Sequence, residues 1–327
     1  MGKMKIAIVY GAICGGCDVA IVNWGEKLID IAKKYDIVYW NAAVDSKLED
    51  LEKIDHINIG IFMGSIRTDL HVKLAKLLRS KSDIIVAYGA CASYGGVPGL
   101  ATLTRKEKLI KDLASTITTE KIEEEDIPDP AKIPELLKTN YALIQIIDPD
   151  IIIPGCPPSS VSNEELAKFL LEYQEGTRLK EKIVFGEENS LCSICPRRPE
   201  DLHKIKMPGI YRLYEVKLDE NKCFLEQGII CMGPATRAAC KAPCIKNNHP
   251  CVGCMGPAPG VDDVGLKYIS SVASLVMVDK EKEILEEGLA KQLDKIVDPI
   301  GVFYKYTLSN SLIAKLAKKS NKRDEKK

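Results

Sequence analysis

The chain of 327 residues is long enough for one large domain or for two domains of ordinary size. Its 46 basic and 46 acidic side chains cancel, so no net field would draw it to nucleic acid or to an anionic membrane surface. No apolar run approaches the ~20 residues of a membrane span, and the sequence therefore predicts a soluble protein whose partners are selected by local surfaces.

Short apolar runs alternate with helical periodicity through the first half of the chain. The predicted strands are residues 4–10, 37–40, 57–63, 84–88 and 150–153, and the predicted helices among them are residues 19–34 and 69–79. Strands that are apolar on both faces and alternate with amphipathic helices are typical of a parallel sheet covered on both sides. Residues 101–140, which contain Pro128, Pro130 and Pro134, interrupt this pattern and are interpreted as a surface insertion with one short helix.

The pattern changes again after the last of these strands. A helix is predicted to begin near Ser162, with Ser162 and Glu165 forming a capping box. From about residue 180 the chain is mostly loops rich in Cys, Pro and Gly, followed by predicted helices at about 265–277 and 281–296 and by a charged tail. We therefore expect two domains, residues 1–178 and 179–327, with metal sites taking the place of a core in the second.

Cysteine carries the strongest signal, because its twelve residues suffice for three sites of four thiolates each, the usual cage of an iron–sulfur cluster. Four cysteines are spread over the first half of the chain: Cys14, Cys17, Cys91 and Cys156. The other eight are crowded together: Cys192, Cys195, Cys223, Cys231, Cys240, Cys244, Cys251 and Cys254. The first half thus offers one site and the second half two.

Two other uses of these cysteines compete with clusters. The N-terminus has neither a signal-peptide pattern nor a twin-arginine pair, which predicts a cytoplasmic protein and argues against disulfides. Structural zinc is the stronger alternative, since Cys-x-x-Cys pairs are its usual signature. Zinc ribbons combine two such pairs in one site, however, whereas each pair in this chain is accompanied by isolated cysteines. The pairs are Cys14/Cys17, Cys192/Cys195 and Cys251/Cys254.

The four cysteines of the first half all follow predicted strands. Loops at the carboxyl ends of parallel strands gather along one edge of the sheet, where ligands bind in such folds. We therefore expect the four thiols to meet at that edge. The glycines beside them, among them Gly89 and Gly155, either let the backbone approach the sulfur atoms or only close tight turns.

Three further features give weaker signals. Asp18, directly after Cys17, is interpreted as a helix cap, with a proton relay as the alternative. His249, beside Pro250 and Cys251, is expected to lie at the surface or behind the ligands rather than to bind metal. Residues 11–16 lack both G-x-G-x-x-G and a Walker lysine, so nucleotide binding is not predicted.

Over essentially its whole length the chain resembles the small subunit of nickel–iron hydrogenases. The matching motifs are Cys14-Gly-Gly-Cys17, Gly89-Ala-Cys91-Ala-Ser-Tyr-Gly-Gly96, Pro154-Gly-Cys156-Pro-Pro158, Cys223, Cys231-Met-Gly-Pro-Ala-Thr, Cys240 and His249-Pro-Cys251-Val-Gly-Cys254. The resemblance implies a flavodoxin-like doubly wound parallel sheet, followed by a loop-rich, cysteine-rich iron–sulfur domain with a few helices. It also implies an oxidoreductase subunit that relays electrons from hydrogen oxidation in a partner large subunit and does not cleave hydrogen alone.

The resemblance further implies three clusters, all of the 4Fe–4S type. Cys14, Cys17, Cys91 and Cys156 would hold the proximal cluster, which faces the nickel–iron centre. Cys192, Cys195, Cys223 and Cys231 would hold the distal cluster, and Cys240, Cys244, Cys251 and Cys254 the medial one. Many relatives have histidine in place of Cys192 and a proline near Cys244 that leaves a three-iron medial cluster, whereas this chain has a thiol at both positions.

Among these hydrogenases the chain is most similar to the small (gamma) subunit of the cytoplasmic methyl-viologen-reducing type of methanogens. That type does not reduce the deazaflavin coenzyme and associates with heterodisulfide reductase. The implied partners are the large subunit and an iron–sulfur adaptor (delta) subunit of a heterodisulfide reductase assembly. The alternatives are a deazaflavin-reducing or sulfhydrogenase-type small subunit and a zinc-stabilised scaffold. The ferredoxin-like Cys-x-x-Cys-x-x-Cys run typical of the deazaflavin-reducing type is absent.

Overall fold

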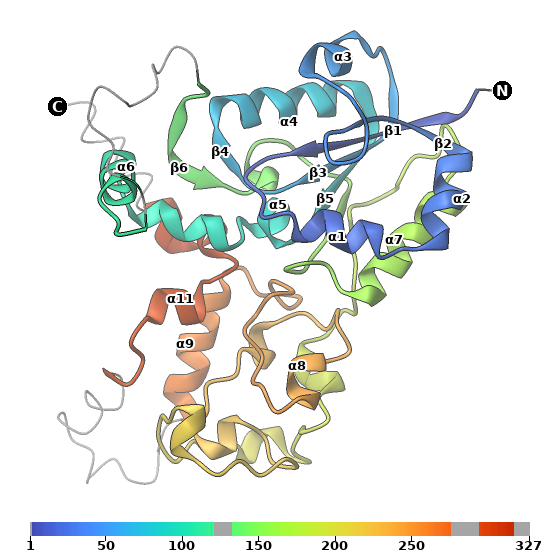
Figure 1. The fold of residues 1–327 in the computed structure, drawn as a ribbon. Coiled ribbons are helices and arrows are strands. Elements are labelled where there is room, and N and C mark those ends of the chain that lie inside the picture. Colours follow the sequence, from blue (N-terminus) through green and yellow to red (C-terminus); the bar gives the residue numbers. More distant parts are fainter. Residues whose placement is uncertain (1, 119, 121–132, 276–293, 317–327) are drawn as a thin grey trace. The chain divides into compact units, whose positions relative to one another are not determined.

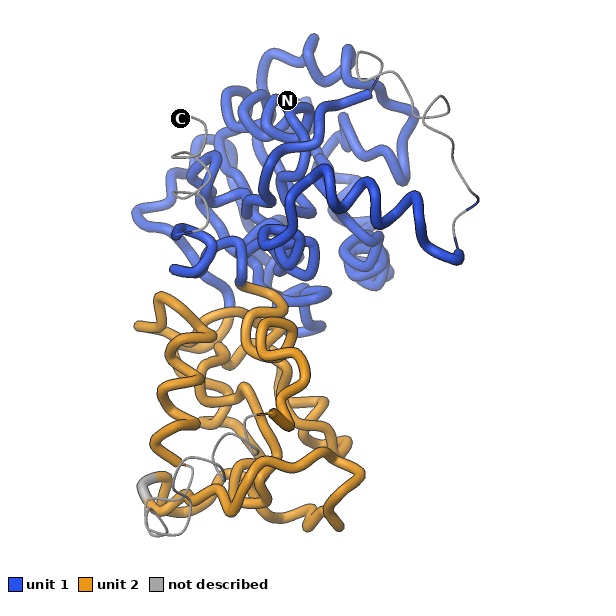
Figure 2. The backbone as a smooth tube through the Cα atoms, turned by 90° about the vertical axis from the view of Figure 1, so that its left-hand side faces the viewer, with its two compact units in different colours: residues 1–185, 308–327 blue, residues 186–307 orange. Residues whose placement is uncertain are grey.

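The computed structural model describes residues 2–118, 120, 133–275 and 294–316. The chain divides into two compact units, which we describe separately (Figure 2). The first comprises Met1–Phe185 and Leu308–Lys327, and the second comprises Gly186–Thr307. The sequence predicted a domain boundary after residue 178, with all later residues in the second domain. This division into two domains stays a prediction. The Asn140 side chain, which donates a 3.0 Å hydrogen bond to Ser309 Oγ, helps to join residues beyond 307 to the first unit.

A six-stranded parallel sheet forms the centre of the first unit (Figure 1). Its strands are β1 (Met4–Tyr10), β2 (Tyr35–Trp40), β3 (Ile57–Met63), β5 (Ser82–Tyr88), β7 (Ile151–Ile153) and β8 (Ile183–Val184). They are arranged in the order β2-β1-β3-β5-β7-β8, and every neighbouring pair is parallel. This is the flavodoxin-like strand order with one further strand at the edge. The fold class expected from the sequence is thereby confirmed.

Helices cover both faces of this sheet, as the alternation along β1 shows. Ile6 and Ile8 pack into one buried cluster, and Ala7 and Val9 into the other, because successive side chains of a strand point to opposite faces. The first face is covered by α1 (Gly16–Val22), α2 (Glu26–Lys34) and α7 (Ser160–Glu172), and the second by α3 (Leu48–Lys53) and α4 (Asp69–Lys81). The sheet is therefore buried on both sides.

Two predicted helix boundaries were wrong. The helix expected over residues 19–34 is divided into α1 and α2 at Gly25, whose φ of 59° interrupts helical geometry. The expected capping box of Ser162 with Glu165 is not formed, because α7 begins two residues earlier than Ser162. Ser159 is the N-cap, and its hydroxyl oxygen accepts a hydrogen bond from the Ser162 backbone N–H.

The insertion contains more structure than the sequence indicated. It holds the expected short helix, α6 (Lys106–Ala114), but also β6 (Leu136–Tyr141), which pairs antiparallel with β4 (Ile66–Thr68). Before the insertion, a further short helix, α5 (Ala90–Tyr94), follows β5 directly. In the described part of the insertion, β6 thus forms a separate two-stranded sheet with the segment that follows β3.

The second unit has little regular structure. Its described α-helices are α8 (Pro243–Lys246), α9 (Val264–Leu275) and α11 (Pro299–Phe303). The helix predicted at 265–277 is confirmed as α9, whereas the one predicted at 281–296 falls largely outside the described residues. Helices α9 and α11 pack through the rings of Tyr268 and Phe303, whose centroids are 5.6 Å apart. Across the described ranges of both units, no helix is both long and apolar enough to cross a membrane.

Gly60, in the middle of β3, generates a test of how tightly the sheet is packed. A Cβ atom at this position would lie 2.6 Å from Ser82 Oγ. We expect Gly60→Ala to lower the free energy of unfolding by about 1–3 kcal/mol through overpacking. A urea titration followed by tryptophan fluorescence measures this, because Trp24 and Trp40 both belong to the first unit. The control is Gly2→Ala, where a Cβ meets nothing within 4 Å; an equal loss in both variants would contradict the packing argument.

Candidate metal centres

The structure brings together the four cysteines that the sequence placed at the edge of the sheet, which we call the first set: Cys14, Cys17, Cys91 and Cys156. They come from the segments that follow β1, β5 and β7, and parallel strands end at the same edge. Burial raises the pKa of the Cys17 thiol well above its usual range, and the other three cysteines raise it further. Each thiol thus lies within electrostatic reach of the others.

Backbone hydrogen bonds fix two of these segments to each other. The Gly89 N–H donates to the Ile153 carbonyl at 2.8 Å, and the Ala90 N–H donates to the Gly155 carbonyl at 2.6 Å. The turn that carries Cys91 is therefore joined directly to the turn that leads to Cys156. Because these bonds involve only the main chain, they hold the two turns together whatever occupies the site.

Two glycines leave room for the sulfur atoms. A Cβ at Gly89 would lie 2.6 Å from Cys17 Sγ, and a Cβ at Gly96 would lie 2.3 Å from Cys91 Sγ. Both glycines also have positive φ, 87° and 58°, which side-chain-bearing residues rarely adopt. The two roles that the sequence left open, closing turns and admitting sulfur, thus apply at the same positions.

Asp18 does not cap a helix, so that interpretation of the sequence was wrong. The N-cap of α1 is Gly15, and Asp18 lies inside the first turn, with its carboxylate turned to the ends of β1 and β2. Its Oδ1 accepts hydrogen bonds from the hydroxyl of Tyr10 and, at 2.9 Å, from Nε1 of Trp40. These two donors fix a carboxylate beside Cys17, whose pKa it helps to raise.

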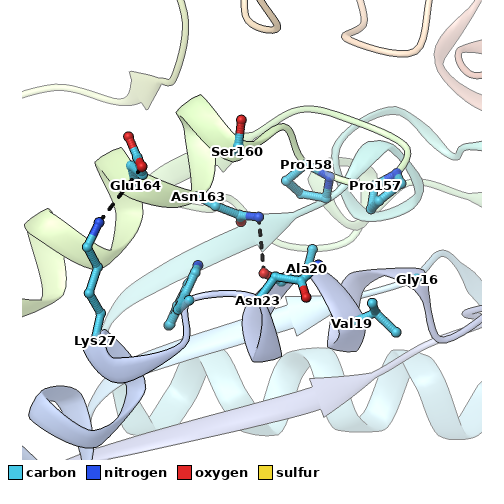
Figure 3. Close-up of a pocket in the computed structure, with 11 residues that line it drawn as sticks. Gly16, Val19, Ala20, Asn23, Lys27, Pro157, Pro158, Ser160, Asn163 and Glu164 are labelled. Atoms are coloured by element: carbon cyan, nitrogen blue, oxygen red, sulfur yellow. Dashed lines mark hydrogen bonds and ion pairs between the residues drawn. The ribbon is translucent and has the colours of Figure 1, made fainter. Parts of the chain in front are cut away.

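A pocket of about 280 Å³ adjoins the first set, between α1 and α7 (Figure 3). One end is closed by Pro157 and Pro158, directly after Cys156, and the other by Lys27 and Glu164, whose Nζ and Oε1 are 4.0 Å apart. Two valines of α1 beside it are exposed, Val19 to 60% and Val22 to 56%, and Cys14 and Cys156 are exposed as well. The first set therefore lies beside exposed apolar side chains.

A second set lies in the second unit and consists of Cys192, Cys195, Cys223 and Cys231. Burial raises the pKa of the Cys192 thiol to about 12, with further contributions from the other three cysteines in the order Cys231, Cys195 and Cys223. Burial also raises the pKa of Cys231 to about 11. The four residues that the resemblance assigned to one site thus lie within electrostatic reach of one another.

The third set, Cys240, Cys244, Cys251 and Cys254, lines a single pocket. Two backbone or hydroxyl groups contact Cys251 Sγ: the Gly253 N–H donates to it at 3.4 Å, and Thr236 Oγ1 accepts from it at 3.7 Å. His249 is not among the residues that line this pocket, and its Nδ1 lies 2.8 Å from the Pro250 carbonyl oxygen. The surface position expected for this histidine is confirmed, since its side chain is exposed.

The second and third sets share part of their surroundings. The backbone N–H of Cys251 donates to Cys231 Sγ at 3.3 Å, and the Met232 N–H donates to the Cys251 carbonyl at 2.9 Å. Cys251 therefore belongs to one set by its side chain and touches the other by its backbone.

Arg197 was not singled out from the sequence. It is 3% exposed and follows Cys195 by two residues, and its side chain holds the segment before Cys223. The only sequence signal for it is its place in Cys195-Pro-Arg-Arg, and that signal does not distinguish it from the exposed Arg198.

The donor atoms of all three sets fit iron–sulfur clusters. Among the described residues, no group of three or more Cys, His, Asp or Glu converges closely enough to hold one metal ion. A four-iron cluster requires a wider spacing of its ligands, because each iron takes its own thiolate and the four thiolates surround the cluster. The space left at Gly89 and Gly96 and the pocket lined by the third set are consistent with this wider spacing.

Comparisons with known proteins point in the same direction. Residues 14–172 match the family model described as NADH ubiquinone oxidoreductase, 20 Kd subunit. An F420-non-reducing hydrogenase subunit of Methanothermobacter marburgensis is 36% identical over 323 residues, which cover 98% of this chain and 99% of that protein. An F420-non-reducing hydrogenase iron-sulfur subunit of Archaeoglobus profundus is 31% identical over 326 residues, with coverage of 95% and 98%.

A solved structure supports the fold. The actinobacterial-type NiFe-hydrogenase from Ralstonia eutropha H16 contains a chain that superposes with a TM-score of 0.50 at 16% identity, covering 90% of this chain and 91% of that one. The full-length relatives determine the assignment: the chain belongs to the family of the small, electron-transferring iron–sulfur subunits of F420-non-reducing nickel–iron hydrogenases, and it is a subunit of an oxidoreductase.

Proposed function

We propose that the three cysteine sets hold three 4Fe–4S clusters and that this chain relays electrons from a nickel–iron centre in the partner large subunit. In this proposal the first set holds the proximal cluster, the third set the medial cluster and the second set the distal cluster. The observation that supports it is that the four cysteines of the first set lie within electrostatic reach of one another, as do those of the second set, and that the four of the third set line one pocket. The bound clusters would supply one-electron redox chemistry.

The chain itself supplies ligands, burial and hydrogen bonds. Burial raises the pKa of the Cys91 and Cys192 thiols to about 12, so in the free chain these thiols carry their protons at neutral pH. Binding a cluster must therefore release protons, since only thiolates ligate iron. The N–H groups that point at Cys231 Sγ and Cys251 Sγ then stabilise the negative charge on sulfur.

The proposed partners are assigned from the surfaces that lie beside the first and second cysteine sets. A large subunit is implied by the family, and the apolar surface of Val19 and Val22 beside the exposed Cys14 and Cys156 suits its docking. We propose that an iron–sulfur adaptor (delta) subunit of a heterodisulfide reductase assembly docks near the second set and receives the electrons. This places the chain in the cytoplasm, where thiols stay reduced.

Metal analysis of the anaerobically purified complex tests the number and type of clusters. We expect about twelve iron atoms and about twelve sulfides from this chain, because three Cys₄ sites each match a four-iron cluster. The iron of the large subunit is subtracted as a known contribution. About eleven irons would indicate a three-iron cluster in the third set despite Cys244. Stoichiometric zinc would show that the sets are structural sites of a scaffold.

Replacement of Cys192 tests the position of the second set at the exit. Cys192→Ala should remove or degrade one cluster and slow electron delivery to the heterodisulfide reductase adaptor by more than tenfold, roughly 1.4 kcal/mol in barrier. Hydrogen–deuterium exchange requires only the nickel–iron site and should be largely retained. Both activities are measured in the assembled complex, with Ser193→Ala as the control. Parallel loss of exchange and transfer in an intact complex would refute the exit assignment.

The docking surface is tested at Val19. Val19→Glu places a charge on the exposed apolar surface and should reduce co-purification of the large subunit, because an ionised carboxylate resists burial at an interface. Val19→Ala keeps the surface apolar and should leave the complex intact. Affinity capture through a tag on this chain gives the ratio of the two subunits. Equal capture by both variants would remove Val19 from the interface.

A further inference from the structure

We infer that Arg197 is a positioning residue for the second cysteine set, in which its buried guanidinium acts as counter-charge to the bound cluster and raises the reduction potential of that cluster. This inference rests on the proposed function, because it takes the second set to hold an iron–sulfur cluster. It concerns a side chain that ligates nothing itself.

The guanidinium is buried among neutral groups. Nη1 donates to the Asp219 carbonyl at 2.9 Å and to the Lys222 carbonyl at 3.3 Å, and Nη2 donates to the amide oxygen of Asn248. The central carbon of the guanidinium lies 4.3 Å from the centroid of the Phe224 ring. Every one of these partners is uncharged.

A buried cation is costly unless a negative charge compensates it. No carboxylate in the described ranges forms an ion pair with Arg197 within 4.0 Å. Its partner Asn248 donates from its side chain to the Glu220 carboxylate at 2.8 Å. The second set supplies the missing charge. Four thiolates around a four-iron core leave about two net negative charges, and the charge of Arg197 already favours the thiolate of Cys195.

The contacts of Arg197 also join the segments that carry the ligands. Its own segment begins at Cys195, its two carbonyl acceptors lie within the four residues before Cys223, and Asn248 lies three residues before Cys251. One side chain therefore holds three loops that contain cysteines. The guanidinium makes these hydrogen bonds at once because it has several donors in a fixed fork, whereas a lysine at this position would keep the charge and only part of the contacts.

Reduction of a cluster adds one negative charge, so a nearby buried cation stabilises the reduced form and raises the potential. The neighbouring Arg198 provides an internal comparison. Its side chain is exposed and, like Arg197, favours the thiolate of a cysteine in the second set, in its case Cys192. Because water and salt screen an exposed charge, its removal should have a smaller effect.

The test uses the assembled complex with Arg197→Gln, Arg197→Lys and Arg198→Gln. Iron is counted in each, and reduction potentials are measured by titration followed by electron paramagnetic resonance. The signal of the second set is identified as the one that disappears in Cys192→Ala. We expect Arg197→Gln to lower the potential of that signal, Arg198→Gln to shift it less, and Arg197→Lys to hold it near the parent value because the charge is kept.

Each outcome supports or overturns the role of the buried charge. If Arg197→Gln loses the cluster whereas Arg198→Gln and Arg197→Lys retain it, that role is supported. An equal shift in Arg197→Gln and Arg198→Gln, or a Lys variant that shifts as far as the Gln variant, would overturn it. A parent complex without iron in the second set would overturn the proposed function as well, so the two failures are distinguishable.

Discussion

Burial of cysteine thiols close to one another is the constraint around which both units are built. In every set, burial and the neighbouring cysteines together disfavour ionisation, as the raised pKa values of Cys17 and Cys192 show. Four such groups can ionise together only if positive charge lies among them or hydrogen bonds point at the sulfur atoms. The N–H groups directed at sulfur in the second unit meet part of this requirement, whereas the glycine turns of the first unit leave room for the sulfur atoms.

The two units hold their cysteines together by different means. In the first unit a conventional core does so: the sheet is buried on both faces, and its parallel strands deliver distant segments to one edge. The second unit has few long elements, and its described loops are held by hydrogen bonds such as that from the Cys231 N–H to the Tyr268 hydroxyl. Its stability must therefore depend more strongly on what the cysteines bind.

Periodicity and spacing predicted the features that depend on local sequence. Strand 57–63 is found with the expected bounds, and the gathering of Cys91 and Cys156 follows from strand direction alone. The roles of Asp18 and Arg197 could not be predicted in this way. Each depends on partners from other segments, Trp40 for the carboxylate and Asn248 for the guanidinium, and a single sequence gives no measure of such approach.

Local rules also failed where two signals competed. Ser162 and Glu165 have capping-box spacing, but Ser159 has an equally suitable hydroxyl one turn earlier and the helix begins there. Apolar periodicity continues from α1 into α2, and only the conformation of Gly25 reveals the break. The division of the eight later cysteines came from resemblance, because spacing alone allows several partitions.

The hydrogen bond from the Cys251 N–H to Cys231 Sγ bears on how the second unit is assembled. If the two sets there hold clusters as proposed, a cluster bound at the third set fixes the loop containing Cys251, and with it an N–H donor that points at the second set. Filling the third set would thus prepare the second, and the chain would pass from empty to fully loaded with few half-filled molecules. Oxidative loss of one cluster would likewise remove a contact of the neighbouring cluster. Loss of one cluster would therefore promote loss of the other, just as binding of one promotes binding of the other.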